Sequence, residues 1–136
     1  MNRYEARTLA FELLFAYTYA AKEDQPNLYD SERSMRGFEE NEYVRDVVQG
    51  VHDNLAALDG KIEDSASGWK IGRFSRVTLS ILRLSVYEML YRTDIPYTVS
   101  INEAVELAKK YDDGKASGFI NGILNTIADK EGLKKS

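Results

Sequence analysis

The stretch SILRLSVYEMLYR, residues 80–92, decides how the rest of the chain must fold. It contains neither Gly nor Pro, and its apolar residues recur at the spacing of an α-helix. Extended back to residue 76, this helix carries apolar side chains on two nearly opposite faces, so we expect it to lie between N-terminal and C-terminal helices. One face comprises Leu79, Leu82, Val86, Met89 and Leu90, and the other comprises Val77, Ile81 and Leu84.

A narrow strip separates the two apolar faces of this helix. It contains Arg76, Ser80, Arg83 and Tyr87. An arginine beside an aromatic ring suits single-stranded RNA, because the guanidinium pairs with phosphate and the ring stacks on a base. An arginine in an apolar helix more often pairs with a carboxylate or extends to the surface. The pattern alone therefore favours a structural role for Arg83 and leaves the RNA role open.

The remaining chain predicts further helices and no strands. Apolar residues recur at helical spacing in the first 20 residues and again over 43–58, where Asp59-Gly60 is expected to end or kink the helix. Between these segments, the polar stretch 22–40 breaks the pattern and is typical of a long linker. We therefore expect an all-α protein.

A second break, near residues 65–70, suggests two subdomains. We place an N-terminal helical subdomain at 1–68, including the linker, and a C-terminal one at 69–136, which together make one domain. In the second, Ser100 and Glu103 have the S-x-x-E spacing of a capping box, which predicts that a helix begins there and continues through Tyr111.

The first helix carries a second edge of arginine and aromatic residues. Arg3, Arg7, Phe11 and Phe15 lie along it, with Tyr4 beside them. Positive charge at a helix N-terminus is unfavourable for the helix dipole, and either an anionic ligand or plain solvation would compensate it. The two phenylalanines are more often core residues than exposed ones, so this edge is only suggestive of a binding site.

Composition limits the classes of function. The chain has 136 residues, no Cys and a formal net charge of −4, which argues against bulk nucleic-acid binding but allows a local basic patch. No apolar run is long enough to span a membrane, and no signal-peptide pattern precedes the first helix. We expect a cytoplasmic protein with no membrane partner.

No pattern for catalysis is apparent. The sequence has neither a Gly-rich phosphate loop nor a thiol, and its only histidine, His52, has no preformed partner. The acidic residues Glu39, Glu40 and Glu42 are explained by the favourable position of negative charge at a helix start. We therefore expect no enzyme activity, no cofactor and no metal.

Three long motifs resemble the NusB family of bacterial transcription antitermination factors: ILRLSVYEML, DIPYTVSINEAVELAKKY and GFINGILNTI. The first helix, RYEARTLAFELLFAY, matches more loosely. The resemblance implies two small helical bundles packed side by side, with about six to seven helices and no enzyme activity. It also implies binding of boxA-type single-stranded RNA together with the ribosomal protein NusE. Other Nus factors and RNA polymerase would complete the assembly, which supports ribosomal RNA transcription.

The resemblance also implies RNA-binding residues. Arg7, Phe15, Arg83 and Phe119 match family positions that meet RNA. We add two basic neighbours, Arg3 in the first helix and Lys115 before the last one. Two other motif residues, Asn121 and Gly122, are interpreted as structural, and Gly122 suggests a close approach between helices because glycine costs about 1 kcal/mol in a helix.

One departure from the family bears on affinity. Family members often begin with several arginines, whereas here Glu5 lies between Arg3 and Arg7. Fewer phosphate contacts predict weaker binding of RNA alone, and hence a strong dependence on NusE.

Two alternatives remain open. A NusB-like domain also occurs fused to ribosomal RNA cytosine methyltransferases, but these need a catalytic cysteine. The other alternative is a helical protein-interaction module, for instance a homodimer that buries the Arg83 edge without binding RNA.

Overall fold

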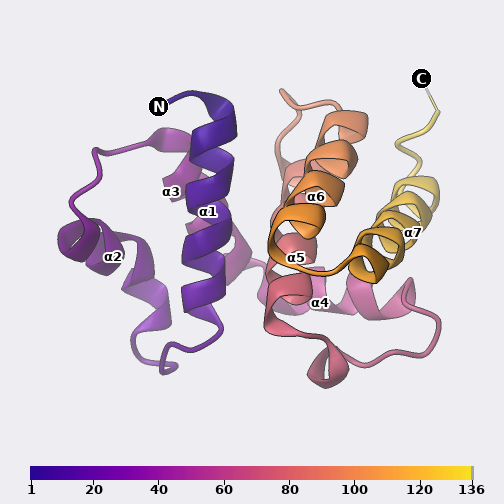
Figure 1. Cartoon of the computed structure of the whole chain (residues 1–136), viewed down its shortest axis with the longest axis horizontal. Coiled ribbons are helices and arrows are strands. Elements are labelled where there is room, and N and C mark those ends of the chain that lie inside the picture. The colour runs from indigo at the N-terminus through magenta and orange to yellow at the C-terminus, as the bar shows by residue number, and fades with distance from the viewer. Residues whose placement is uncertain (136) are drawn as a thin grey trace.

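The computed structural model describes residues 1–135 and shows an all-α fold. Within this range seven α-helices and two short 3-10 turns are present, and no strand, which confirms the predicted fold class. In Figure 1, α1, α2 and α3 lie on one side and α5, α6 and α7 on the other, with α4 beneath α5. The elements are α1 (Arg3–Tyr17), η1 (Gln25–Asn27), α2 (Leu28–Arg36), α3 (Glu42–Asp53), α4 (Leu55–Asp64), η2 (Ile71–Arg73), α5 (Arg76–Tyr91), α6 (Tyr97–Tyr111) and α7 (Gly114–Lys130).

Helix α5 is the centre of the fold. Ser75 caps it by accepting a hydrogen bond from the Thr78 amide, and every residue from Thr78 through Met89 is buried. The helix contacts α1, α3 and α4 as well as α6 and α7. Both apolar faces are therefore covered, as the sequence predicted. Because α4 contacts α3 as well as α5 and α7, the division of the chain at residue 68 stays a prediction.

Helix α1 begins with a capping box that the sequence analysis did not identify. The Asn2 side chain accepts from the Glu5 amide at 2.8 Å, and the Glu5 carboxylate accepts from the Asn2 amide at 2.9 Å. This pairing satisfies two backbone donors at the helix start. It also places a negative charge near the positive end of the helix dipole, which offsets Arg3.

The expectation of a linker over residues 22–40 is wrong for most of its length. The segment contains η1 and the nine-residue helix α2. Leu28 and Tyr29 are buried, and the Tyr29 hydroxyl donates to the Asn41 carbonyl at 3.4 Å. Gly37 ends α2 in the left-handed conformation, with φ of 74°. The helix has only these two buried residues, too few to create a visible apolar stripe.

Two predicted helix boundaries are also corrected. Helix α6 begins at Tyr97, directly after Pro96, so Ser100 lies inside its first turn and is not a cap. Ser100 is buried, and its hydroxyl donates to the Glu88 carboxylate at 2.8 Å. The break between α3 and α4 falls at Asn54, whereas Gly60 lies inside α4.

The close helix approach expected at Gly122 occurs at Gly50 instead. Gly122 is exposed, and a Cβ built on it would meet nothing within 4 Å. A Cβ on Gly50 would lie 2.2 Å from the ring of Tyr87, so only glycine lets α3 approach α5 there. No helix in the described part of the chain is long and apolar enough to cross a membrane.

Candidate nucleic-acid interface

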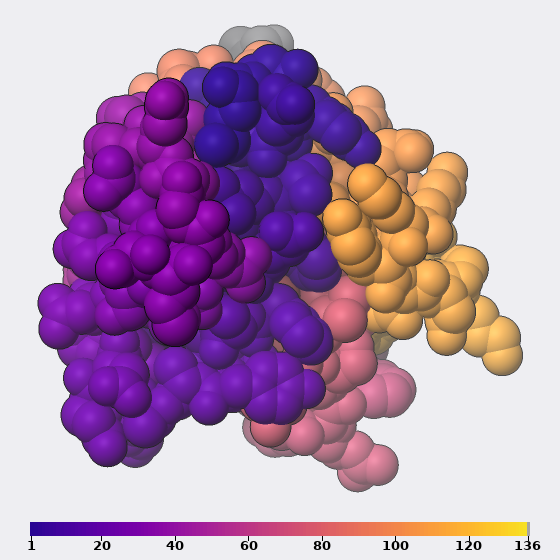
Figure 2. All heavy atoms as spheres, turned by 60° about the vertical axis from the view of Figure 1, so that its left-hand side comes forward, coloured from indigo at the N-terminus to yellow at the C-terminus, as the bar shows by residue number. Residues whose placement is uncertain are grey.

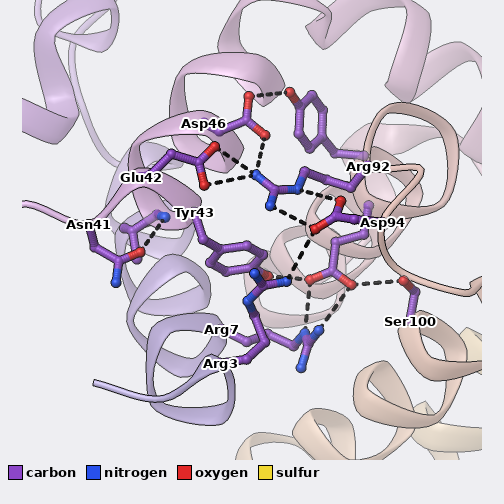
Figure 3. A network of polar contacts seen from close by, with 12 residues as sticks. Arg3, Arg7, Asn41, Glu42, Tyr43, Asp46, Arg92, Asp94 and Ser100 are labelled. Atoms are coloured by element: carbon purple, nitrogen blue, oxygen red, sulfur yellow. Dashed lines mark hydrogen bonds and ion pairs between the residues drawn. The ribbon is translucent and has the colours of Figure 1, made fainter.

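Arg7 lies in a buried network between α1, α3, α5 and α6 (Figure 3). Its Nε donates to Glu88 Oε2 at 2.8 Å, and the same carboxylate accepts from the Ser100 and Tyr43 hydroxyls. Burial, followed by the negative charge of Glu88, raises the pKa of Tyr43, so Tyr43 remains a donor. The side chain of Arg7 is 6% exposed. Its charge is therefore directed at a protein carboxylate and away from solvent.

Arg3 lies at the edge of the same network. Its guanidinium is 4.5 Å from the centre of the Tyr43 ring, and Asp94 lies 3.9 Å from its Nη1. Arg92 pairs with Asp94 and also with Glu42 (Figure 3). Burial disfavours the charged form of Arg92, but hydrogen bonds to Asp94 and Asp46, together with the negative charge of Glu42, outweigh it and raise the pKa of Arg92. The surroundings of Arg3 are thus rich in negative charge.

Arg83 is a core arginine held by a carboxylate, which is the structural role that the sequence pattern alone favoured. Its Nε and Nη2 each donate to the Asp59 carboxylate of α4 at 2.9 Å, and 9% of its side chain is exposed. Ser80 and Tyr87 of the same strip are also buried, and the Tyr87 hydroxyl donates to Asp46. Only Arg76 of that strip is exposed.

The other three predicted residues, Phe15, Lys115 and Phe119, line two adjoining grooves. The two grooves are lined by successive residues: Val77 and Tyr111 line the first, and Thr78 and Asp112 line the second, where the Thr78 hydroxyl donates to the Asp112 carboxylate at 2.9 Å. In Figure 2 the surface of α1 and that of the C-terminal half meet along an indentation. We call the first groove the α1 groove; it is lined by Phe11, Glu12, Phe15, Arg36, Val77 and Tyr111. We call the second the α7 groove; it is lined by Trp69, Arg73, Phe74, Ser75, Thr78, Asp112, Asp113, Lys115, Ala116 and Phe119.

Three aromatic rings make one wall of the α7 groove. The ring centre of Phe119 lies 5.5 Å from that of Trp69 and 5.6 Å from that of Phe74. Trp69 is 48% exposed, so a large part of its apolar ring is in contact with water. A partly exposed cluster of this kind provides faces on which a planar ligand can stack.

Exposed cations accompany the rings. Arg73 and Lys115 are exposed, and among the described residues neither makes an ion pair. Near the α1 groove, the Arg76 guanidinium lies 4.0 Å from the centre of the Tyr19 ring and donates to the Thr18 carbonyl. Aromatic rings beside unpaired cations can bind a ligand that is both planar and anionic.

Four residues of this surface were missed as site residues in the sequence analysis: Tyr19, Trp69, Arg73 and Phe74. The run GWKIGRFSR, residues 68–76, alternates aromatic and basic side chains and was the available signal. It lacks helical periodicity, because residues 71–73 form a 3-10 turn. The loop is held in place by Glu63, whose carboxylate accepts from the Ile71 amide at 2.7 Å.

The described residues also contain no candidate metal site. No group of three or more His, Asp or Glu side chains in that part of the chain could hold an ion. His52 is half-buried, and its Nδ1 lies 2.7 Å from the hydroxyl of the buried Tyr17. Glu40 pairs with Arg45 at 2.8 Å.

Comparison with known proteins identifies the family. The NusB family model matches residues 4–129. The chain therefore belongs to the NusB family. The transcription antitermination protein NusB of Ruminiclostridium cellulolyticum is 42% identical over 130 residues, which cover 94% of this chain and 89% of that protein. The NusB of Acetivibrio thermocellus is 44% identical over 133 residues, covering 93% and 88%.

Solved NusB structures share this fold. T. maritima NusB superposes with a TM-score of 0.84 at 31% identity, covering 96% of this chain and 92% of that one. A chain from a crystal structure of the antitermination factors NusB and NusE in complex with dsRNA gives a TM-score of 0.79 at 27% identity, covering 96% and 99%.

Proposed function

We propose that this NusB family member is a transcription antitermination factor that binds boxA-type single-stranded RNA together with NusE. Other Nus factors and RNA polymerase complete the assembly, which acts in the cytoplasm on ribosomal RNA transcription. The proposal includes no catalytic activity and no cofactor. The observation that carries it is the α7 groove, where three aromatic rings lie beside Arg73 and Lys115, two exposed cations that make no ion pair among the described residues.

The physics of single-stranded RNA fits these grooves. Unpaired bases stack on exposed aromatic rings, and each such contact contributes about 1–3 kcal/mol. Phosphates pair with arginine and lysine at the groove edge. Because Arg73, Arg76 and Lys115 are few, the electrostatic part of the affinity is small. This supports the expectation that the chain needs NusE for tight binding.

The surroundings of the six predicted RNA-binding residues suggest two roles. Phe15, Lys115 and Phe119 would contact RNA directly, with Trp69 and Arg73 as neighbours in the α7 groove. Arg7, Arg83 and Arg3 lie beside protein carboxylates, and breaking a buried ion pair costs about 3–5 kcal/mol. We assign Arg7 and Arg83 to holding α1, α4 and α5 in place.

The experiment is a titration of fluorescently labelled boxA RNA, followed by anisotropy, with and without NusE. Phe119→Ala and Lys115→Ala should weaken binding at least about fivefold while leaving the melting temperature within a few degrees. Lys109→Ala, on an exposed part of α6, is the matched control and should bind as the parent does.

Three outcomes would contradict the proposal or part of it. Equal RNA affinity with and without NusE would remove the dependence on the partner. Unchanged binding by both groove variants would remove the grooves as the site. If the groove variants instead abolish a homodimer, measured by sedimentation, and no RNA binds, the protein-interaction module becomes the better explanation.

A further inference from the structure

Two carboxylates lie in the α7 groove, where an anion-binding site should have none. Asp112 and Asp113 join α6 to α7 and line the groove together with Trp69 and Phe119. Negative charge near bound phosphate is unfavourable, so these residues oppose binding of the RNA backbone. They are well suited, however, to accept hydrogen bonds from the edge of a base.

The fold holds both carboxylates in fixed positions. Asp112 accepts from the Thr78 hydroxyl through Oδ2 and from the Asp113 amide through Oδ1, each at 2.9 Å. Asp113 caps α7, because its Oδ1 accepts from the Lys115 and Ala116 amides at 2.9 Å. Within residues 1–135, Asp113 Oδ2 accepts no hydrogen bond. A carboxylate has about four acceptor positions, so both side chains can accept more.

From this arrangement we infer that the α7 groove is a pocket for one guanine base, read by the carboxylates of Asp113 and Asp112. The guanine edge donates from N1 and from the 2-amino group, which matches an acceptor-only carboxylate. Uracil presents one donor between two carbonyl oxygens. Adenine and cytosine each place a ring-nitrogen acceptor beside the amino group, which would face the carboxylate unfavourably. The inference rests on the proposed function and adds base selectivity to it.

The groove favours a nucleotide over the other ligand that suits aromatic rings and carboxylates, an arginine of a partner protein. Arg73 and Lys115 lie at the same groove and are exposed. They would repel an incoming guanidinium, whereas they would attract the phosphates on either side of a base. The groove volume of about 260 Å³ is also large enough for a nucleobase.

The test uses twelve-nucleotide single-stranded RNAs that differ at one central position, in the presence of excess NusE. One RNA is uridine throughout, one has a central guanosine, and one has a central inosine, which lacks the 2-amino group. Trp69 is the only tryptophan of the chain, so quenching of its fluorescence reports occupation of the groove. Trp69→Phe keeps a ring and shows which part of the signal comes from elsewhere.

We expect the guanosine RNA to bind about tenfold more tightly than the uridine RNA, with inosine between them and with quenching of Trp69. Asp113→Asn should remove most of this preference. The variant should fold, because asparagine caps a helix as well as aspartate does. Asp24→Asn, which makes the same charge change at an exposed position outside the α7 groove, should keep the preference.

Each other outcome overturns the inference. If uridine and guanosine RNAs bind equally, the carboxylates do not read the base, although RNA binding and the proposed function stand. A guanosine preference that survives in Asp113→Asn, or that leaves Trp69 fluorescence unchanged, places base recognition elsewhere. Quenching by an arginine peptide but by none of the RNAs would make the groove a protein site. If no RNA binds at all, the proposed function fails as well.

Discussion

Arginine occupies two contrasting environments in this protein. Arg7 and Arg83 lie where helices meet, each paired with a carboxylate at 2.8–2.9 Å and with less than a tenth of the side chain exposed. Arg73 and Arg76 lie at the edge of the grooves, exposed and without an ion pair among the described residues. The comparison shows that an arginine free to bind phosphate cannot be identified from its match to a family position alone, nor from its place on the polar strip of α5 alone.

The difference has a simple electrostatic origin. A guanidinium withdrawn from water must be paired with a carboxylate, because an unpaired buried charge costs several kcal/mol. Once paired it offers little net charge to a ligand. An exposed guanidinium on an acidic protein keeps its charge available, so the rim of the grooves is where substitutions should affect RNA and not stability.

The largest expected effect is at Arg7. Arg7→Met leaves the buried Glu88 carboxylate without its charge partner, and we expect the free energy of unfolding to fall by about 3–5 kcal/mol. Urea denaturation followed by circular dichroism measures this. Arg33→Met, an exposed position on α2, should change it by less than about 0.5 kcal/mol. A stable Arg7→Met protein that loses RNA binding would put Arg7 in the binding site and break the comparison.

A smaller loss of stability is expected at Arg83. Asp59 is 20% exposed and can regain some water, so Arg83→Met should cost about 2–3 kcal/mol. The double variant Arg83→Met with Asp59→Leu should recover part of that loss, because no charge is then left unpaired. If the second substitution does not restore stability, Arg83 stabilises the protein through contacts other than its ion pair with Asp59.

Loss of the Trp69 ring should affect RNA alone. Trp69→Ala should weaken RNA binding by about 1–2 kcal/mol, roughly five- to thirtyfold, through lost stacking. Because Trp69 is half exposed, the free energy of unfolding should change by less than about 1 kcal/mol. Trp69→Phe retains a stacking surface and should bind RNA nearly as well as the parent. If it is as weak as Trp69→Ala, the ring acts through some other contact.

The smallest effect concerns the salt dependence of binding. Arg73→Ala should reduce the slope of log affinity against log salt by about 0.7, the value for one phosphate contact on a single strand. Titrations over a series of salt concentrations measure the slope. Arg33→Ala removes the same charge on the α2 side and should leave the slope unchanged. A slope equal to the parent's for Arg73→Ala would exclude a phosphate contact there.

Most of the fold could be predicted because long helices with buried faces leave a strong periodic pattern. Helix α5 is the clearest case, with apolar residues on both sides. Helix α2 escaped detection because burial of Leu28 and Tyr29 alone makes no stripe. The start of α6 was misplaced because Ser100 has the spacing of a cap but is instead committed to Glu88, a contact between helices that local sequence does not encode.

The site was harder to predict, because burial depends on contacts that are distant in sequence. Arg83 meets Asp59, which is 24 residues away, and Arg7 meets Glu88, which is 81 residues away. Nothing near either arginine in the sequence identifies its partner. The grooves likewise combine α1, the loop before α5 and the start of α7, so Phe15, Trp69 and Phe119 appear unrelated until the chain is folded.

The Glu88 carboxylate has a consequence for how the chain unfolds. It projects from α5 and accepts hydrogen bonds from Arg7 of α1, Tyr43 of α3 and Ser100 of α6. If α1 and α3 separate from α5 and α6, the Glu88 side chain loses part of this set of hydrogen-bond donors while still attached to α5. We expect the two halves of the molecule to melt in one cooperative transition, with amide protons of α1 and α6 exchanging at similar rates.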